Sequence, residues 1–467
     1  MDADAAYAFA RFAANMGYED VPPDVVAITK KQIMDILGVT LGGSYKPGIR
    51  ELAELIKEWG GKEESSIFCF GGKVPAPQAA QVNASMGHAL DYDDTGSGPT
   101  HPSVVVVPTC LVMAEQQGNF SGKDLIAAVA VGTELMCRLG QAFRSGHLDM
   151  PSGGHPGAGW HLTTLYGYIA TAAVAGRIMG LTEKQIVNAM GIAYHQCSGN
   201  GQTVTEGALT KRMGPGFSAK GGITAAFMAQ KGITGAEQCL EGECGLYHLY
   251  HHGKYVSAAL TEDLGQKFLS LEVAMKPYPC CRGTHAFADA ATELATVHNI
   301  DVSQIKEIIL YTGETTSFLL FPLEKRTRPE TAVDTQFSIP WAVSAILTRK
   351  KASVGDFSDE AIADAELLAL AAKVKVVHAP DMVGTDEVPP ARIMITLNDG
   401  QTVTAEKKID TKAKQEPQPL SVYETKFRDC VAYSVKHFSD QEIDALVEQI
   451  THLDQLGDVQ SLIGMLS

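Results

Sequence analysis

The sequence lacks the long apolar runs of a membrane span or a signal peptide. Its longest uninterrupted apolar stretches, such as Val104 to Val107 and Leu125 to Val131, fall well short of the ~18 residues that a spanning helix requires. The N-terminal segment carries Asp2, Asp4 and Arg11 among alanines and aromatic residues, so it offers no apolar core for export. We therefore predict a cytoplasmic protein with no membrane partner.

Basic residues are also few. The chain has 38 Lys and Arg against 54 Asp and Glu, which gives a formal net charge of −16. This balance repels nucleic acid at long range, so we expect no nucleic-acid partner. It would equally repel an anionic substrate. A site for a small di- or tricarboxylate would therefore need a few placed lysines and arginines to make it locally positive.

Cysteine pairs and phosphate-binding motifs are missing. The nine cysteines are an odd number, lie dispersed along the chain and form no CxxC motif, so reduced thiols are expected. The adjacent Cys280 and Cys281 are poorly placed for a ring-closing disulfide or for two ligands of one zinc ion. The GxxxxGK(S/T) pattern is absent, which disfavours nucleotide binding. We expect no metal and no organic cofactor.

The sequence does contain long helical patterns of ordinary globular composition. Its 467 residues exceed the ~250 to 300 at which a single hydrophobic core stops growing, so two domains are expected. Ala-rich helical segments fill residues 3–265, and several, such as Leu162 to Met179, are apolar on nearly every face. Other helices or a second subunit must bury such faces, and we predict a homodimer.

The pattern changes after Leu271. Runs typical of β-strands occur at residues 305–311 and 374–378, and Asn398-Asp399-Gly400 has hairpin turn chemistry. Helical periodicity returns at residues 440–466, behind the helix-starting Ser439. The predicted fold class is mainly α: a large all-α helical domain of residues 1–268 and 405–467, plus a smaller α+β lid domain of residues 269–404. We expect the C-terminal tail to pack back on the helical domain.

The stretch from Gly87 to Ser103 is dense in His and Asp. It contains His88, Asp91, Asp93, Asp94, Thr95 and His101. Their spacing would let His88, Asp91 and Thr95 share one helical face, and a loop over residues 96–99 would return His101 to them. Such side chains suit proton transfer at a carbon beside a carboxylate. The alternatives are a site for Mg, Mn or Fe and a structural set of caps and salt bridges.

Two Gly-rich segments add candidate residues. In "SGGHPGAGWHLTTLYG", His155 and His161 flank a turn, and His161 near a helix N-terminus would have a lowered pKa beside a place that welcomes an anion. A histidine that merely caps the helix is the alternative. In "LTKRMGPGFSAKGG", Lys211 and Arg212 precede a predicted Gly-Pro-Gly turn and a helix expected to begin near Phe217. Lys211 suits recognition of a carboxylate.

The segment "MKPYPCCRGTHAFADA" lies at the predicted domain junction, where ligand sites are common. Arg282 could hold a carboxylate bidentately, and Lys276 could neutralise a second one or shuttle a proton. A nucleophilic cysteine assisted by His285 is a weaker alternative, because small buried cysteines are usually inert. For Arg326 and Arg328, further along the chain, a solvated surface is the favoured interpretation over carboxylate contacts.

Taken in order, "GHALDYDDT…THPS", "GWHLTT", "LTKRMGPGFSAKGGITAAFMAQKGITG" and "KPYPCCRGTHAFADA" resemble the MmgE/PrpD family over nearly the whole chain. The resemblance implies a metal-free homodimer with an active site between the helical domain and the lid. The family includes 2-methylcitrate dehydratase, cis-aconitate decarboxylase and iminodisuccinate epimerase. Matching to the decarboxylase branch carries over Asp91, Thr95, His101, His161, Lys211 and Lys276. That branch has a histidine where this chain has Cys281, so the resemblance is nearer to the dehydratase branch.

The leading hypothesis is a hydro-lyase that dehydrates 2-methylcitrate or a related hydroxy-polycarboxylate. The candidate catalytic residues are Asp91, His101, His161, Lys211 and Lys276. The candidate substrate-binding residues are Thr95, Tyr278, Cys281, Arg282 and His285, and no residue is assigned to a metal. The alternatives are an epimerase or isomerase of a dicarboxylate such as iminodisuccinate, a decarboxylase of the cis-aconitate type, and a non-catalytic carboxylate-binding homologue.

Overall fold

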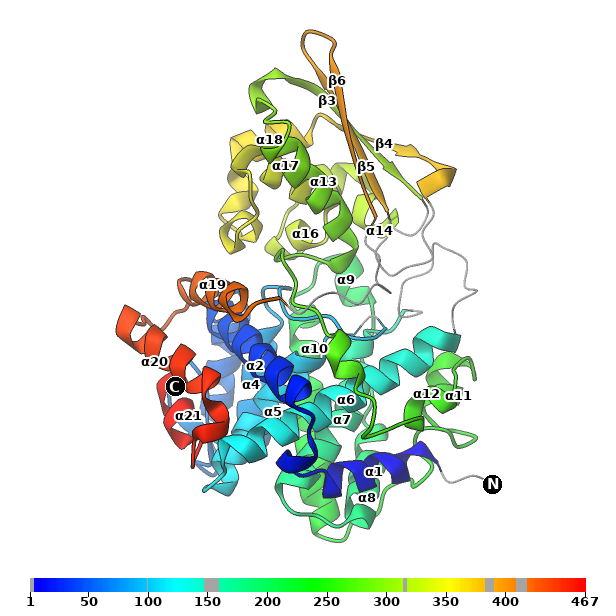
Figure 1. The fold of residues 1–467 in the computed structure, drawn as a ribbon, viewed down its shortest axis with the longest axis vertical. Coiled ribbons are helices and arrows are strands. Elements are labelled where there is room, and N and C mark those ends of the chain that lie inside the picture. Colours follow the sequence, from blue (N-terminus) through cyan, green and yellow to red (C-terminus); the bar gives the residue numbers. More distant parts are fainter. Residues whose placement is uncertain (1–3, 99, 147–158, 314–316, 383–389, 409–417) are drawn as a thin grey trace.

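The computed structural model describes residues 4–98, 100–146, 159–313, 317–382, 390–408 and 418–467. Within these residues the chain forms a large helical part and, at one end of it, a smaller part that carries a four-stranded sheet (Figure 1). The predicted fold class, mainly α with a smaller α+β domain, is confirmed. The first and last helices both belong to the helical part.

The helical part is built from two stretches that lie far apart along the chain. Its helices are α1 (Ala5–Asn15), α2 (Pro23–Gly43), α3 (Ile49–Trp59), α4 (Ala76–Gly87), α5 (Pro102–Gln117), α6 (Gly122–Gly146), α7 (Leu162–Ile178), α8 (Glu183–Tyr194), α10 (Thr210–Gln230), α11 (Leu246–His251), α12 (Ala258–Thr261), α19 (Leu420–Val431), α20 (Asp440–Thr451) and α21 (Gln460–Leu466). A two-stranded ribbon of β1 (Ser65–Ser66) and β2 (Lys73–Val74) lies between α3 and α4 in the chain. Helix α7 is apolar all round because other helices surround it, and every residue except Arg177 is buried.

Helix α6 is long and apolar enough to cross a membrane, judged by length and composition over Gly122–Phe143. The fold buries 94% of its most apolar window, however. A core helix passes the same test, so this helix is weak evidence for a membrane span.

The C-terminal helices complete the core of the helical part. Helix α19 lies so close to α2 that a Cβ atom at Gly38 would be 2.8 Å from the Cα atom of Phe427. Helix α20 begins after the predicted Ser439, whose hydroxyl accepts from the Glu442 amide while the Glu442 carboxylate accepts from the Ser439 amide. The buried side chains of α19, α20 and α21 join the same apolar core as those of α1. The prediction that the tail packs back on the helical domain is confirmed.

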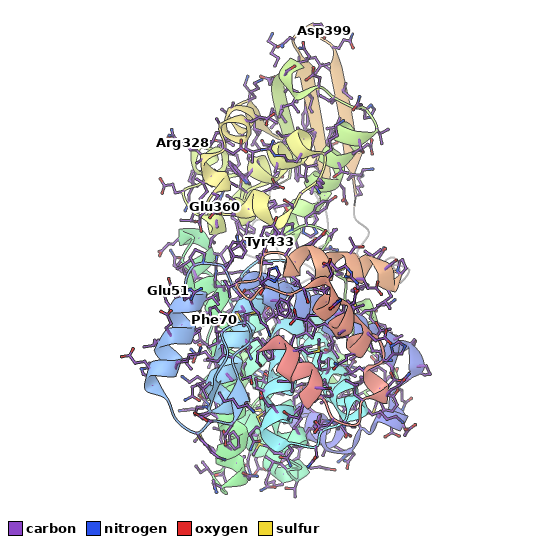
Figure 2. The ribbon with its side chains drawn as sticks, turned by 90° about the vertical axis from the view of Figure 1, so that its left-hand side faces the viewer. Glu51, Phe70, Arg328, Glu360, Asp399 and Tyr433 are labelled. Atoms are coloured by element: carbon purple, nitrogen blue, oxygen red, sulfur yellow. The ribbon has the colours of Figure 1, made fainter. Side chains whose placement is uncertain are left out.

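The smaller part is a mixed sheet packed against helices. Its strands are β3 (Ile305–Thr312), β4 (Val374–His378), β5 (Ala391–Leu397) and β6 (Thr402–Lys407), in the order β4-β3-β5-β6. Its helices are α13 (His285–Thr296), α14 (Ser317–Leu320), α15 (Leu323–Thr327), α16 (Ala332–Gln336), α17 (Ile339–Arg349) and α18 (Ala365–Ala371). Strand β3 runs parallel to β4 and antiparallel to β5. The predicted hairpin joins β5 to β6, with Gly400 at φ 86° and Asp399 at its outer tip (Figure 2).

The two largest apolar cores among the described residues correspond to the two parts. The larger core draws on the N-terminal helices and on α19 to α21, and the smaller core draws on α13, α17 and the sheet. Val204 of α9 (Gln202–Glu206) belongs to the smaller core, although α9 lies in the chain between helices of the larger part. The limits proposed for the two domains stay a prediction.

Candidate active site

The His/Asp-rich stretch is a loop between two helices. Helix α4 ends immediately before His88, and Asp91 has a left-handed backbone with φ 51°. Thr95 forms an antiparallel bridge with Ala274, in which each backbone amide donates to the other residue's carbonyl at 2.9 Å. The predicted common helical face of His88, Asp91 and Thr95 is therefore wrong, because this backbone pairs with a distant segment instead of its own next turn.

The loop returns His101 to the cluster by lying directly on α6. Gly98 has φ 65°, and a Cβ atom there would be 2.6 Å from the carbonyl oxygen of Gly140. A Cβ atom at Gly140 would in turn be 2.1 Å from the carbonyl oxygen of Ser97, so neither glycine tolerates a side chain. His101 then forms the N-cap of α5, and its amide donates to the Thr163 hydroxyl at 3.0 Å. The predicted return of His101 is confirmed, although Pro99 lies outside the described residues.

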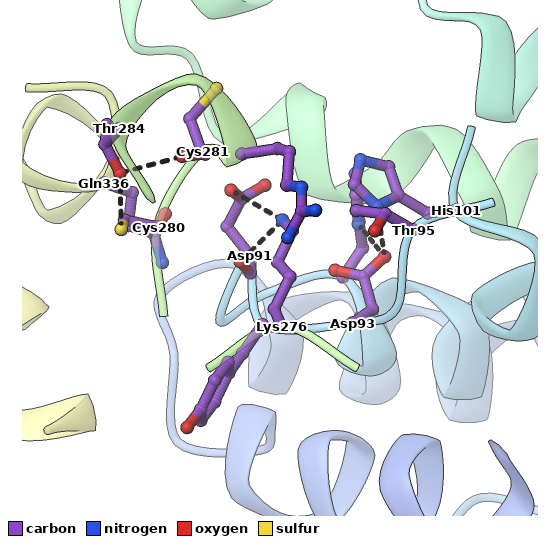
Figure 3. Close-up of polar contacts among 12 residues, drawn as sticks. Asp91, Asp93, Thr95, His101, Lys276, Cys280, Cys281, Thr284 and Gln336 are labelled. Atoms are coloured by element: carbon purple, nitrogen blue, oxygen red, sulfur yellow. Dashed lines mark hydrogen bonds and ion pairs between the residues drawn. The ribbon is translucent and has the colours of Figure 1, made fainter. Parts of the chain in front are cut away.

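Asp91 is held between two buried lysines, Lys211 and Lys276. Figure 3 shows Lys276 beside Asp91. Lys211 forms an ion pair with one oxygen of the Asp91 carboxylate. Lys276 lies 3.1 Å from the other oxygen and 2.8 Å from the Asp91 backbone carbonyl. Burial raises the pKa of Asp91, but the two ammonium groups outweigh it and hold the pKa well below its usual value. All three groups are charged, so the trio is net positive within a strongly acidic protein.

Lys211 reaches Asp91 from the first turn of a continuous helix. Helix α10 begins at Thr210 and runs through Pro215, so the predicted Gly-Pro-Gly turn and the later helix start are wrong. The neighbouring glycines allow close helix contact instead. A Cβ atom at Gly216 would be 2.2 Å from the carbonyl oxygen of Gln81 in α4. This contact sets α10 against α4, whose end carries the His/Asp-rich loop.

His101 presents an uncharged imidazole of defined tautomer. Its Nδ1 lies 2.6 Å from the backbone carbonyl oxygen of Asp94, and a carbonyl only accepts, so Nδ1 carries the proton. Burial lowers the pKa of His101 to about 3, so the ring is neutral at neutral pH. The basic nitrogen is therefore Nε2, on a side chain that keeps 16% of its surface exposed. This is the form that a general base requires.

Two further histidines form a hydrogen-bonded chain beside His101. His88 Nδ1 lies 2.8 Å from the Asp93 carboxylate, and its Nε2 lies 3.3 Å from Nε2 of His161. Nδ1 of His161 lies 2.6 Å from the Thr164 hydroxyl. Burial holds the pKa of both rings well below the usual value, so both are neutral. Thr164 then donates to His161, which donates to His88. His88 donates to Asp93, and this assigns a tautomer to each ring.

His161 occupies the predicted helix start as the N-cap of α7. Its partner in the sequence motif, His155, lies outside the described residues.

His88, Asp91 and Asp93 are the group with the geometry for a metal ion among the residues that the structure describes. Each offers one ligand atom, and these atoms lie within 4.8 Å of one another. The Asp91 carboxylate, however, already contacts the ammonium groups of Lys211 and Lys276. A cation would have to enter beside two positive charges and break the bond between His88 and Asp93. The arrangement therefore favours an ion-paired acid/base cluster over a metal site.

Asp94 has a structural role, which was one of the alternatives for this stretch. Its carboxylate accepts from the Ser103 amide at 3.2 Å and from the Ser103 hydroxyl, in the first turn of α5. Burial raises the pKa of Asp94 to about 7. Asp94 thus caps α5 and, through its carbonyl, orients the His101 ring.

Cys281 lies near the cluster, as Figure 3 shows, and its amide donates to the Gln336 carbonyl at 2.9 Å. Burial raises the pKa of the Cys281 thiol to about 11, so it is uncharged at neutral pH. The neighbouring Cys280 sulfur lies 2.8 Å from the Thr284 hydroxyl. Neither thiol has the lowered pKa of a cysteine nucleophile.

The other candidates of this motif lie against α13. Nη1 of Arg282 is 3.5 Å from Nδ1 of His285, and the His285 ring packs edge-on against Tyr278. The Tyr278 hydroxyl donates to Asp289 at 2.8 Å. The Tyr278 hydroxyl therefore bonds to a residue of α13 and not to Asp91. Lys276, Cys281 and Thr95, in contrast, lie at the acid/base cluster.

Two residues at the site were not found from the sequence. Lys426 of α19 donates to the Tyr92 carbonyl at 2.8 Å and the Lys276 carbonyl at 3.1 Å, and it pairs with buried Asp35 at 2.7 Å. Gln336 of α16 donates to the Ala89 carbonyl at 3.2 Å. For Lys426, the sequence did contain one signal: a lysine on the apolar side of a helix, where burial beside a charged partner is expected.

The expected solvated surface for Arg326 and Arg328 is correct for only one of them. Arg328 is exposed, and Figure 2 shows it at the outer surface of the smaller part. Arg326 is only 4% exposed, which corrects the prediction. Its backbone carbonyl accepts from the hydroxyl of Ser338, the N-cap of α17, and its guanidinium lies 4.0 Å from the Asp334 carboxylate of α16.

Comparison with known proteins places this fold and site in a family. Residues 7–258 match the MmgE/PrpD N-terminal domain, and residues 278–452 match the MmgE/PrpD C-terminal domain. The chain belongs to the MmgE/PrpD family.

Particular curated relatives are lyases. A cis-aconitate decarboxylase of Aspergillus terreus (strain NIH 2624 / FGSC A1156) is 26% identical over 479 residues, covering 98% of this chain and 94% of that protein. The cis-aconitate decarboxylase of Homo sapiens is 28% identical over 456 residues, covering 95% and 90%. That of Mus musculus is 27% identical over 461 residues, covering 95% and 89%. These relatives support a lyase in general, without specifying dehydration.

Proposed function

We propose that this chain is a lyase that removes water from a small hydroxy-polycarboxylate such as 2-methylcitrate. The observation that carries the proposal is the hydrogen bond from His101 Nδ1 to the Asp94 carbonyl. It leaves Nε2 as a neutral base beside a positively charged cluster. Removal of a proton from carbon next to a carboxylate needs this combination, because the base takes the proton while nearby cations stabilise the developing negative charge.

The proposed reaction balances as a β-elimination. His101 Nε2 takes a proton from the carbon beside a carboxylate, and the electron pair of that C–H bond forms the C=C bond. The C–O bond breaks, and the leaving hydroxyl takes a proton from the Lys211 ammonium to depart as water. Asp91, bonded to Lys211 and Lys276, holds both ammonium groups in place. The positive charge of this trio also attracts the anionic substrate.

The proposal needs no metal ion, because lysine ammonium groups supply the positive charge. The test is to treat the purified protein with a chelator and to measure formation of an unsaturated product from 2-methylcitrate and from citrate. Turnover that survives chelation supports the proposal. Absence of elimination from every hydroxy-polycarboxylate in a panel, by protein that binds them, would refute it.

A second candidate is decarboxylation of a cis-aconitate-like acid, which the names of the relatives favour. The neutral thiol at Cys281, where the decarboxylase branch has a histidine, counts against it. Release of carbon dioxide from cis-aconitate, measured beside the dehydration assay, separates the two reactions. An epimerase would instead exchange substrate hydrogen with deuterated water without losing a group. Binding without either turnover or exchange would indicate a non-catalytic homologue.

We also propose a cytoplasmic location for the protein. We further propose that it works as a homodimer. Support comes from large apolar side chains left exposed on α3 and at α10, including Trp59 at 60% and Phe217 at 41%. A Lys220 ammonium lies 5.7 Å above the Trp59 ring, so these two helices share one surface. Sedimentation of the full chain, compared with a Trp59→Glu/Phe217→Glu variant, tests this assembly.

A further inference from the structure

Arg326 is a buried cation whose donors are not satisfied. It lies in α15 with 4% of its surface exposed, and its Nε and Nη1 atoms donate no hydrogen bond within the described part of the chain. Its ion-pair partner there, Asp334, is 4.0 Å from Nη1. A buried guanidinium in this state is unfavourable unless something else accepts from it.

Asp334 is already engaged by other groups. One of its oxygens lies 3.0 Å from the Lys325 ammonium, and the other accepts from the Thr331 hydroxyl at 2.8 Å. Its charge is therefore shared between Lys325 and Arg326. Because both oxygens of the buried Asp334 carboxylate have nearer partners and Nη1 of Arg326 stays 4.0 Å away, Asp334 accepts no hydrogen bond from that atom.

Arg326 is positioned by a segment of the chain that also contacts the candidate active site. Its backbone carbonyl accepts from the Ser338 hydroxyl at 2.6 Å, at the start of α17. Two residues earlier, Gln336 bonds to both Cys281 and Ala89 of the site. Between these two residues, the Phe337 ring lies 5.2 Å from the Lys211 ammonium, so residues 336–338 join Arg326 to the acid/base cluster.

We propose that Arg326 binds a substrate carboxylate remote from the reacting carbon, and that it makes the site prefer acids with three carboxylates over acids with two. The inference rests on the proposed function, because it takes the ligand to be a polycarboxylate. In the proposed reaction Lys211 and Lys276 act at the reacting carbon, so a carboxylate remote from that carbon needs a different cation. A planar, permanently charged guanidinium with free donors is the group that proteins use for carboxylates.

The experiment measures binding of two unreactive acids by calorimetry. Tricarballylate has three carboxylates and glutarate has two, and neither carries a hydroxyl group to eliminate. Arg326→Gln should weaken tricarballylate binding by about 10- to 100-fold and leave glutarate binding within about two-fold, as expected for loss of one charged hydrogen-bonding partner. Arg326→Lys should recover part of the affinity. Arg328→Gln, two residues away and exposed, is the matched control and should change neither.

Thermal unfolding distinguishes ligand binding from a structural role. Removing a buried group with unsatisfied donors should leave the melting temperature of Arg326→Gln unchanged or raise it. A clear fall in melting temperature, equal weakening of both acids, or undiminished tricarballylate binding would each overturn the role of Arg326. If the wild-type protein binds neither acid, the polycarboxylate function itself fails, and the Arg326 inference fails with it.

Discussion

The ammonium group of Lys426 donates a hydrogen bond to the backbone carbonyl of Lys276 at 3.1 Å. The same ammonium donates to the Tyr92 carbonyl at 2.8 Å, next to Asp91 in the chain. Helix α19 thus joins the two backbone segments that carry Asp91 and Lys276. Lys426 is a positioning residue, because its contacts are with the supports of the acid/base cluster.

Replacing Lys426 by Met should lower both stability and turnover. Loss of the ammonium leaves Asp35 buried without its cation, which costs about 3 to 5 kcal/mol of unfolding free energy. The double variant Asp35→Asn/Lys426→Met should regain most of that stability but keep a low kcat, because the two carbonyls still lack their donor. Chemical denaturation and kcat measurements on both variants check this. Equal recovery of stability and turnover would assign Lys426 a purely structural role.

Replacing His101 by Gln should reduce kcat by about 100- to 10,000-fold with little change in substrate binding, as expected for removal of a general base. The same variant should lose exchange of the substrate C–H with deuterated water, which isolates proton removal from later steps. Unchanged exchange in His101→Gln would transfer the base role to another group, with His161 the next candidate.

Replacing Asp93 by Asn should reverse the direction of the hydrogen bonds that run from Thr164 through His161 and His88 to residue 93. An amide can donate to His88 Nδ1, which would move the proton of that ring to Nε2 and force His161 to accept there. We expect a loss of about 100-fold in kcat at nearly unchanged stability, by analogy with other tautomer-fixing carboxylates. Nitrogen chemical shifts of the two rings would show the change of tautomer directly.

Acid should destabilise the protein through its buried histidines. In the folded chain burial holds the pKa of His161 well below that of the unfolded chain, so below about pH 6.5 the unfolded state binds a proton that the folded state refuses. Stability is therefore lost as pH falls. His161→Gln should make this loss shallower by about 1.4 kcal/mol per pH unit between about pH 5 and 6.

Asp94 should affect the pH dependence of stability in the direction opposite to His161. Its folded pKa of about 7 lies above that of the unfolded chain, so in the same pH range the folded state holds a proton that the unfolded state releases. Asp94→Asn removes this effect and should make the acid-induced loss steeper. Urea unfolding at several pH values measures both slopes, and slopes that move in the same direction would contradict the assignment.

Gly216→Ala should destabilise the protein by about 1 to 3 kcal/mol and reduce turnover, because the new methyl group meets the backbone of α4 and shifts the helix that carries Lys211. Gly464 in α21 is the control, since a Cβ atom there meets nothing within 4 Å. Gly464→Ala should stabilise by about 0.5 to 1 kcal/mol. Thermal melts and kcat of the two variants give the comparison.

Local patterns in the sequence predicted local structure well. Strand β4 occupies the predicted residues 374–378, and Ser439 caps the predicted helix with the predicted side chain. The prediction was wrong at α10, where Gly-Pro-Gly indicated a turn. The glycines there serve contact with α4, and a pattern confined to one segment carries no information about its neighbour.

The candidate site was predictable in its residues but not in its connections. Asp91, His101, Lys211 and Lys276 do gather, since dense titratable motifs mark such clusters. Lys426 escaped because its partners lie hundreds of residues away, and only the fold brings them together. Arg326 was assigned to a solvated surface because arginines are mostly exposed, and its burial depends on packing by α16 and α17.

The bond from Lys426 to the active-site backbone has a consequence for protein synthesis. A ribosome releases the N-terminal segments first, so Asp91, His101 and Lys211 emerge long before α19. Until α19 is made, the Tyr92 and Lys276 carbonyls lack the Lys426 ammonium that joins them, so the acid/base cluster is without this brace. A nascent chain can therefore form its early helices before the acid/base cluster is braced, and we expect turnover to rise once α19 has left the ribosome.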